Sequence, residues 1–132
     1  MSQQVLQPAG WARPRGYANG IATAGRQVFI SGQIGWNGQC EFTSDRFSDQ
    51  VRQALSNIVA ILAEAGGRPE HLVRLTWYVT SRAEYLDEIA AVGAAYREVI
   101  GRHFPTMAVV QVVALMEARA RVEIEATAVI PP

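Results

Sequence analysis

The chain has 132 residues, 49% of them hydrophobic and 18% charged, and this composition excludes a disordered segment. Twelve basic and twelve acidic residues cancel, and no run of either sign occurs, so the sequence offers neither a nucleic-acid stripe nor a membrane-surface patch. All twelve basic residues are arginine, and the absence of lysine excludes Schiff-base chemistry and a lysine-held pyridoxal cofactor.

Length and cysteine content set further bounds. We expect one domain over residues 1–132, because a chain of this length can bury one hydrophobic core. The single cysteine cannot form an internal disulfide, and the start MSQQVLQPAG lacks the charged and apolar parts of a signal peptide, so we expect a cytoplasmic protein. Two histidines and one cysteine, widely separated, do not make a metal site.

The first third of the chain has β-strand character. Residues 7 to 16 contain proline and glycine without periodicity, which predicts an extended lead-in. Two β-rich runs, 17 to 23 and 27 to 34, flank Ala24-Gly25, and this spacing predicts a hairpin. Gly32 and Gly35 indicate a bulge or a close backbone approach.

Residues 48 to 65 carry apolar side chains at helical spacing, and Gly66-Gly67 follows as a stop, so a helix is predicted there. The apolar positions are Val51, Ala54, Leu55, Ile58, Val59, Leu62 and Ala65. Residues 74 to 80, RLTWYVT, have strand composition.

A second helix is predicted from Ser81, because Glu84 three positions later completes a capping box, and Gly101 ends it. Its apolar face holds Leu86, Ile89, Val92, Tyr96 and Val99. Two further strands are predicted over 106 to 114 and 119 to 130, the latter with alternating apolar and polar residues. The predicted order is ββ-α-β-α-ββ, an α+β fold.

Two amphipathic helices cover only one face of such a sheet. Strand 106 to 114, however, is apolar on both sides, with Met107, Val109 and Val113 on one and Ala108, Val110, Val112 and Ala114 on the other. We therefore expect the second face to be apolar and to be covered by self-association. The alternative is a monomer whose long loops fold over that face.

Five segments, GYANGI, VFISGQIG, QALSNIVAILAEAG, the strand after Pro105 and VEIEATAV, together resemble the RidA/YjgF family over nearly the whole chain. The resemblance implies a chorismate mutase-like fold with two helices on one face of a mixed sheet. It also implies a homotrimer with a barrel-like core and ligand clefts between subunits. Archetypal members hydrolyse reactive enamines and imines such as 2-aminoacrylate without a metal or organic cofactor, and an endoribonuclease label is also used for the family.

The resemblance assigns cleft residues one at a time. Tyr17 matches the cleft tyrosine, Ser31 and Gly32 match the Ser-Gly pair, and Glu123 matches the carboxylate that holds the reacting water. Three positions depart from the family. Met107 replaces the arginine that clamps the substrate carboxylate, Val109 replaces a cysteine, and Gly93 stands where the family has a cleft asparagine.

Each assignment has a structural alternative. Glu123 suits water activation, but it is equally explained as a surface residue paired with an arginine. Tyr17 is expected to contact ligand rather than only to end a strand, and Ser31-Gly32 to form a ligand cradle rather than a simple bulge. Met107 and Val109 line the cleft or belong to the core. The missing cation could come from Arg13, Arg15, Arg102 or His103, although solvated charges are the commoner outcome.

A bidentate arginine–carboxylate pair contributes roughly 1.5 to 3 kcal/mol, and methionine supplies neither charge nor donor. The sequence therefore predicts a small-molecule deaminase that is not an archetypal 2-aminoacrylate deaminase, with an aminomuconate-like enamine as one possible substrate. The second hypothesis is a non-catalytic ligand-binding or regulatory trimer. Ribonuclease activity is disfavoured, because no basic stripe or His/Lys acid-base set is present.

Overall fold

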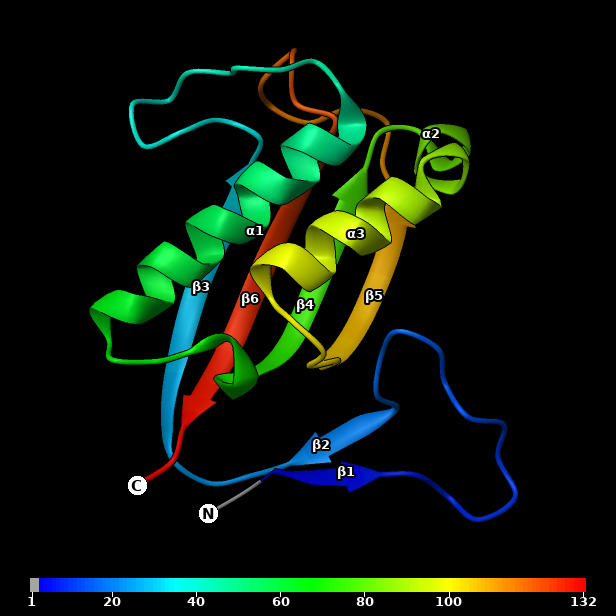
Figure 1. Ribbon diagram of the computed structural model, residues 1–132, viewed down its shortest axis with the longest axis vertical. Coiled ribbons are helices and arrows are strands. Elements are labelled where there is room, and N and C mark those ends of the chain that lie inside the picture. Colours follow the sequence, from blue (N-terminus) through cyan, green and yellow to red (C-terminus); the bar gives the residue numbers. More distant parts are fainter. Residues whose placement is uncertain (1–2) are drawn as a thin grey trace.

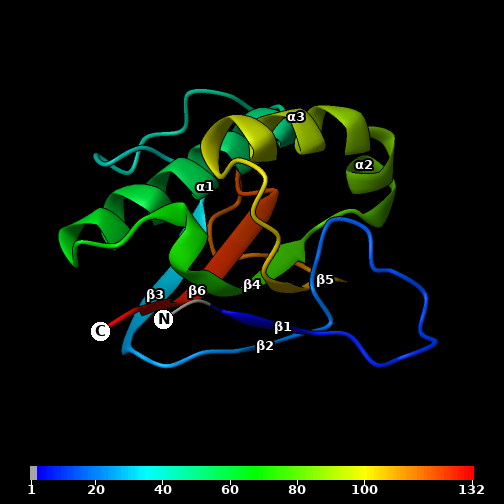
Figure 2. The same ribbon diagram turned by 60° about the horizontal axis from the view of Figure 1, so that its bottom comes forward.

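The computed structural model describes residues 3–132 and contains a four-stranded mixed sheet with helices packed on one of its faces (Figures 1 and 2). The strand order is β3-β6-β4-β5; β3 and β4 pair antiparallel with β6, and β5 runs parallel to β4. The elements of this layer pair are β3 (Arg26–Ile34), β4 (Leu72–Val79), β5 (Thr106–Gln111), β6 (Val122–Ile130), α1 (Phe47–Glu64), α2 (Arg82–Asp87), α3 (Ile89–Val99) and the short 3-10 helix η1 (Pro69–His71). The predicted α+β fold is confirmed.

The core lies between α1, α3 and the sheet. The predicted apolar stripe of α1 is confirmed, because Val51, Leu55 and Ile58 are fully buried. Alternate residues of β6 face the same layer, and Val122 and Ile124 have no exposed surface. Each such aliphatic side chain contributes about 1.5 to 3 kcal/mol on burial, so this layer fixes α1 and α3 against the sheet.

The predicted second helix begins after Ser81, whose hydroxyl accepts a hydrogen bond from Glu84 N at 3.1 Å. Only this half of the predicted capping box is found among the described residues, because the Glu84 carboxylate pairs with Arg121 at 3.0 Å. The helix is interrupted at Glu88, which separates α2 from α3. The Glu88 carboxylate accepts hydrogen bonds from Ser48 N and from the Arg46 side chain, both at 3.3 Å. An acidic group at the start of α1 complements the helix dipole, so the interruption ties the α2–α3 junction to that end.

The predicted hairpin of 17–23 with 27–34 is wrong. Residues Gly20–Ala22 (β2) pair instead with Gln4–Leu6 (β1) in a separate two-stranded sheet, and β3 pairs with β6. Gly25 adopts φ +149° with its Cα against the Ile130 carbonyl, which directs β3 onto β6. The backbone before β2 is also engaged elsewhere, because Ala18 N donates to Pro105 O at 3.0 Å.

The predicted strand 106–114 ends at Gln111, and residues 112 to 121 form a loop. The predicted strand 119–130 correspondingly begins only at Val122. Val113 and Met116 in this loop are 103% and 96% exposed, so the loop projects apolar side chains into solvent.

The expectation of an apolar second sheet face is only partly correct. The outer strands present Phe29, Ala108 and Val110 there, whereas the inner strands β4 and β6 present polar residues. These polar residues are Arg74, Thr76, Tyr78, Glu123, Glu125 and Thr127. Strand alternation explains the difference, because the apolar side chains of each inner strand point to the helix-covered face and the polar ones between them point to the other. We call the uncovered side the open face.

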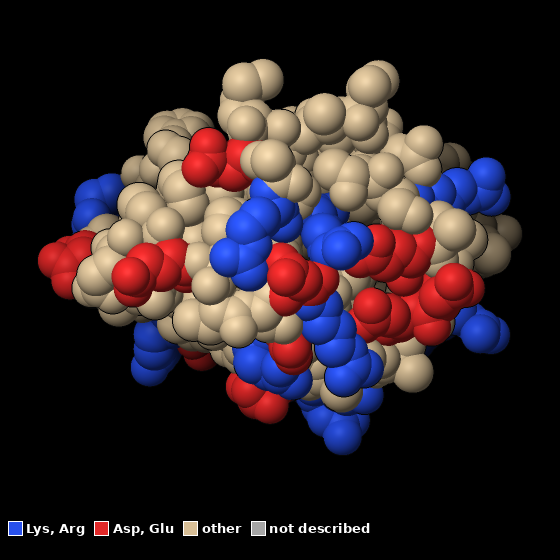
Figure 3. Space-filling model, turned by 90° about the horizontal axis from the view of Figure 1, so that it is seen from above, with Lys and Arg blue, Asp and Glu red and all other residues tan. Residues whose placement is uncertain are grey.

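Charge is mixed on the end of the molecule seen in Figure 3, where acidic and basic side chains alternate without forming a patch of one sign. Within residues 3–132, no helix is long and apolar enough to cross a membrane.

Candidate functional site

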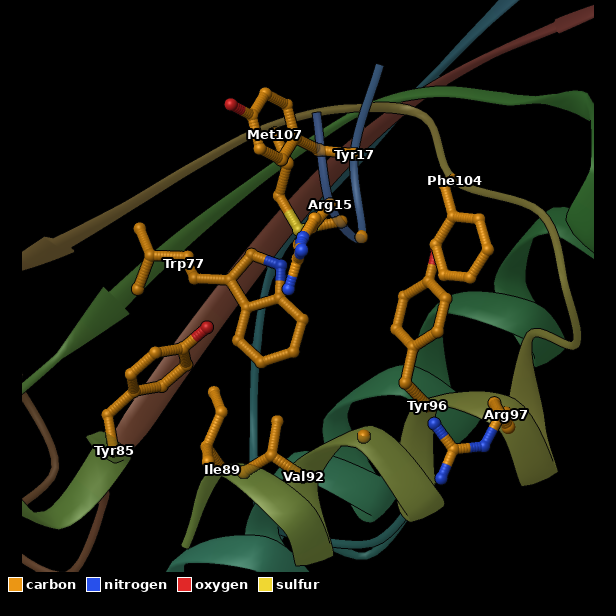
Figure 4. Close-up of a pocket in the computed structure, with 13 residues that line it drawn as sticks. Arg15, Tyr17, Trp77, Tyr85, Ile89, Val92, Tyr96, Arg97, Phe104 and Met107 are labelled. Carbon is orange, nitrogen blue, oxygen red and sulfur yellow. The ribbon is translucent and has the colours of Figure 1, made fainter. Parts of the chain in front are cut away.

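A cavity of about 640 Å³ lies between α3 and the helix-covered side of β4 and β5 (Figure 4). We call it the aromatic pocket, and its lining residues are Arg15, Gly16, Tyr17, Trp77, Tyr85, Ile89, Val92, Gly93, Tyr96, Arg97, Phe104, Met107 and Val109. Four positions assigned from sequence, Tyr17, Gly93, Met107 and Val109, are therefore brought together. Met107 and Val109 line this pocket and pack against the core without being wholly buried.

One wall of the pocket is a single stripe of α3. Ile89, Val92, Gly93, Tyr96 and Arg97 follow the i, i+3, i+4 spacing that places helix residues on one face. Val92 and Tyr96 are buried, whereas Ile89 is 48% exposed. Ile89 therefore forms the rim of the pocket and not part of the core that its periodicity predicted.

The opposite side is completed by the lead-in segment. Ala18 forms an isolated parallel bridge with Thr106, and its backbone N–H donates to Pro105 O. This pairing fixes Tyr17 beside Met107 at the start of β5, with 43% of the tyrosine exposed. The same segment brings Arg15 to the pocket, and Figure 4 shows its side chain directed toward Trp77.

Aromatic rings dominate the interior. Tyr96 stacks on Phe104 with ring centroids 5.8 Å apart, and Trp77 meets Tyr85 edge-on at 6.4 Å. Trp77 is 2% exposed, and its indole Nε1–H has no hydrogen-bond partner in the part of the chain that the structure describes. A buried donor without a partner is destabilising by about 1 to 3 kcal/mol, so a ligand that offers an acceptor would gain from this group.

Burial controls the protonation of the pocket tyrosines. It raises the pKa of Tyr85 and, more strongly, that of Tyr96 above the ordinary value. The Tyr96 hydroxyl donates a hydrogen bond to His103 O at 2.6 Å. Both phenols are therefore neutral at physiological pH and act as hydrogen-bonding groups and apolar surfaces rather than as bases.

The pocket wall is cationic. Among the residues that the structure describes, Arg15 and Arg97 line it, and no aspartate or glutamate does. Neither arginine takes part in an ion pair among residues 3–132. Of the four groups considered as replacements for the missing cation, only Arg15 reaches the aromatic pocket; Arg13, Arg102 and His103 line a neighbouring hollow. Arg97 was not anticipated from the sequence, where it is one of twelve scattered arginines.

The other three assigned residues, Ser31, Gly32 and Glu123, lie together on the open face, and we call them the Glu123 group. The predicted bulge is present in β3 between Ile30 and Gln33, and it brings the Gly32 backbone against the Glu123 carboxylate. A β-carbon at position 32 would overlap that carboxylate. Glu123 is half-buried and forms no ion pair or side-chain hydrogen bond within residues 3–132, so no arginine of the same chain is its partner.

The Glu123 group and the aromatic pocket lie on opposite sides of the sheet, because Glu123 alternates with the buried Val122 and Ile124, while Met107 and Val109 face the helices. One chain therefore does not bring all seven assigned residues into one site. Within the described residues, no cluster of three histidine, cysteine or acidic side chains has the geometry to hold a metal ion.

Comparison with known proteins places this geometry in a family. The family described as endoribonuclease L-PSP matches residues 11–130. The chain belongs to this family. It is 32% identical to TdcF of Escherichia coli over 116 residues, covering 86% of this chain and 85% of that protein. It is 32% identical to the human 2-iminobutanoate/2-iminopropanoate deaminase over 108 residues, covering 81% and 75%. A RutC family protein of Aquifex aeolicus matches at 42% over 64 residues, about half of each chain (47% and 51%).

Solved structures of related proteins support the same family membership. A Rid family protein of unknown function from Yersinia pestis, YyfB, superposes with a TM-score of 0.85 at 29% identity, covering 98% of this chain and 100% of that one. The structure of E. coli TdcF with bound serine gives a TM-score of 0.68 at 33% identity, covering 92% and 91%. The RidA/YjgF resemblance inferred from sequence is thus confirmed, and the chain is a member of a family that includes reactive-intermediate deaminases.

Proposed function

We propose that this L-PSP family member is a hydrolytic deaminase of a reactive enamine or imine, and that it acts as a homotrimer at clefts between subunits. The observation that carries the proposal is the half-buried Glu123 carboxylate, which lies against the Gly32 backbone with no partner among the described residues. A sheltered, unpaired carboxylate is suited to orient a water molecule and accept its proton. The similarity to the human imine deaminase supports the same chemistry.

The reaction assigns a role to each group. Water adds to the carbon of the C=N bond while Glu123 takes one of its protons, and the nitrogen is then protonated. Collapse of the resulting carbinolamine breaks the C–N bond, releasing ammonia and leaving a carbonyl product. Tyr17 donates a hydrogen bond to the substrate, and Ser31 and Gly32 offer a hydroxyl and a backbone N–H to its carboxylate or carbonyl oxygen. No cofactor is required for this hydrolysis.

A second copy of the chain supplies what one copy lacks. The aromatic pocket and the Glu123 group lie on opposite sides of one sheet, so they share a substrate only if the pocket of one subunit faces the Glu123 group of a neighbour. Phe29, which is 73% exposed on the open face, and Val113 and Met116 in the projecting loop supply apolar surface for such contacts. Closed rotational symmetry then repeats the cleft once per subunit.

The substrate differs from that of the archetypal members. Met107 lines the pocket at the position of the family's clamping arginine and provides no charge. We therefore expect weak activity on 2-aminoacrylate, and catalysis on an enamine or imine whose anionic group is held by another residue.

The test is ammonia release from imino acids generated in situ, compared between the native protein and Glu123→Gln. The expected loss is about 100-fold or more, in line with removal of a general base. Glu125→Gln is the matched control, because Glu125 lies on the same side of β6 and is hydrogen-bonded to the Tyr78 hydroxyl at 2.7 Å. Ligand binding without ammonia release from any imine would leave a non-catalytic binding protein as the function.

A further inference from the structure

Gly93 occupies the middle of α3, where it faces the aromatic pocket. Glycine inside a helix is less favourable than alanine by about 0.5 to 1 kcal/mol, so this position needs a structural reason. The space beside Gly93 is filled by the side chain one turn later. A β-carbon at position 93 would lie 3.3 Å from Arg97 Nη1, and, apart from the adjacent residues and the helix's own backbone, no other heavy atom of the described chain lies within 4 Å of that point.

The Arg97 guanidinium thus lies back along the helix over Gly93. Helical side chains point toward the N-terminus of their helix, and residues four apart are stacked on one face, so this conformation is the one the backbone favours. Figure 4 shows the guanidinium directed back along α3, while the ring of the neighbouring Tyr96 projects into the pocket. Arg97 is one of the residues that line the pocket. The missing side chain at position 93 is what leaves room for the guanidinium at the pocket wall.

Arg97 is available to a ligand. It forms no ion pair and no side-chain hydrogen bond within residues 3–132, whereas five other arginines of the chain are held by carboxylates. No acidic residue of the described chain lines the aromatic pocket, and Arg15 adds a second positive charge from the other wall. Both features favour an anionic ligand, and a carboxylate suits the planar fork of a guanidinium.

The interior of the pocket defines the rest of the ligand. Trp77, Tyr85 and Phe104 present ring surfaces around a volume of about 640 Å³, far more than the two or three carbons of a small imino acid fill. Trp77 also holds the only buried side-chain N–H without a partner in the described structure. An aromatic ring on the ligand packs against these ring surfaces, and an acceptor atom next to the ligand carboxylate, an imine nitrogen or a keto oxygen, suits the indole N–H.

We propose that Arg97, admitted by Gly93, is the carboxylate-binding residue of this pocket, and that the pocket takes 2-imino acids with an aromatic side chain. The substrate class rests on the proposed deaminase function, whereas carboxylate binding by Arg97 does not. The reaction is R–CH₂–C(=NH)–COO⁻ + H₂O → R–CH₂–C(=O)–COO⁻ + NH₃, with R an aryl group. The 2-oxo acid product keeps the carboxylate and an acceptor oxygen, and it serves as a stable probe of the pocket.

Calorimetric titration with phenylpyruvate and with pyruvate tests the proposal. We expect native protein to bind phenylpyruvate at least about 10-fold more tightly than pyruvate, since the ring adds buried apolar area. Arg97→Gln is expected to weaken phenylpyruvate binding by about 10- to 100-fold, the range for a charge-assisted pair. Arg82→Gln is the control, because it removes another exposed helix arginine, one that lies outside the pocket.

Gly93→Asn tests the link between the two positions. The new side chain occupies the space of the guanidinium, so binding is expected to weaken as in Arg97→Gln, with Arg97 itself intact. Ala94→Asn is its control, because it adds the same side chain to the exposed neighbouring position. Thermal unfolding of each variant identifies any that has lost its fold, and Gly93→Ala, which displaces only the tip of Arg97, should retain binding within about 3-fold.

Unchanged phenylpyruvate affinity in Arg97→Gln, or equal affinity for pyruvate and phenylpyruvate, would overturn the proposal. Ammonia release from the imino acid of phenylalanine, measured in the same variants, separates it from the deaminase function. Arginine-dependent binding without turnover would retain Arg97 as the carboxylate-binding residue and reject the deaminase. Turnover that is insensitive to Arg97→Gln would retain the deaminase function and reject Arg97 as the carboxylate-binding residue.

Discussion

The Gly32 backbone and the Glu123 carboxylate are in contact, so closely that a β-carbon on Gly32 would overlap the carboxylate group. The contact exists because the bulge in β3 between Ile30 and Gln33 turns the chain at the point where it passes β6. Glycine is therefore required here for proximity to another side chain and not for an unusual backbone angle. This geometry makes position 32 a sensitive test of the role of Glu123.

We predict that Gly32→Ala displaces the Glu123 carboxylate and reduces deaminase activity by about 100-fold, comparable with loss of the general base. The rate of ammonia release is the measurement. Gly38→Ala is the control, because a β-carbon there meets no atom within 4 Å. Full activity in Gly32→Ala would mean that the position of Glu123 is unimportant for catalysis.

The second prediction concerns Met107, which is partly buried where β5 begins beside Tyr17. Met107→Arg restores a cation and two or more donors at this wall, so activity on 2-aminoacrylate should rise, by about 10-fold for a contribution near 1.5 kcal/mol. Met107→Leu keeps the size and apolar character of the site and should not change that activity. An unchanged rate in Met107→Arg would show that the absent arginine does not limit activity on small substrates.

Much of the fold could be predicted because its signals are local. The stripe of α1 and the alternation of β6 identify their buried faces without knowledge of the partners. Errors occur where pairing is non-local. Residues 17 to 23 have the composition of one strand of a hairpin, but their backbone hydrogen bonds go to Gln4–Leu6 and to Pro105. No local sequence pattern predicts these partners.

The site divides in the same way. Tyr17, Gly93, Met107 and Val109 line one pocket, but the family resemblance could not reveal Arg97 or Trp77. Arg97 becomes visible only once α3 is placed on the sheet, although its spacing of four from Gly93 was the signal in the sequence. The unpartnered indole of Trp77 is a property of packing, and residue identity alone does not predict it.

The third prediction is oligomeric. Native protein should sediment at three times the 14.4 kDa chain mass at micromolar concentration. Phe29→Asp places a charge in the exposed apolar surface of the open face and should shift the protein toward the monomer. Activity should be lost as well, because the aromatic pocket of one subunit then no longer faces the Glu123 group of another. Ile61→Asp introduces the same charge at a 40% exposed position on α1, on the opposite side, and should remain trimeric. A native monomer that is fully active would refute the shared cleft.

The fourth prediction uses the buried hydroxyl of Tyr96. Tyr96→Phe removes the hydrogen bond to His103 O and should lower the free energy of unfolding by about 1 kcal/mol at pH 7. Burial raises the pKa of Tyr96 in the folded state above the 10.0 that applies to the unfolded chain. Below pH 10 both states carry the proton, so the contribution is fully present; above it the unfolded state releases the proton first, and stability falls with rising pH.

Native protein should therefore lose stability more steeply than Tyr96→Phe between about pH 10 and pH 11, and the difference between the two proteins should shrink over that interval. Urea unfolding at pH 7, 9, 10 and 11 measures the difference in unfolding free energy between the two proteins. The contributions of the other three tyrosines cancel in this difference, because both proteins contain them. A difference that stays constant with pH would mean that Tyr96 titrates normally in the folded protein. In that case the wall of the pocket beside Arg97 would be open to water, and a carboxylate bound there would be held far less tightly than a dry site permits.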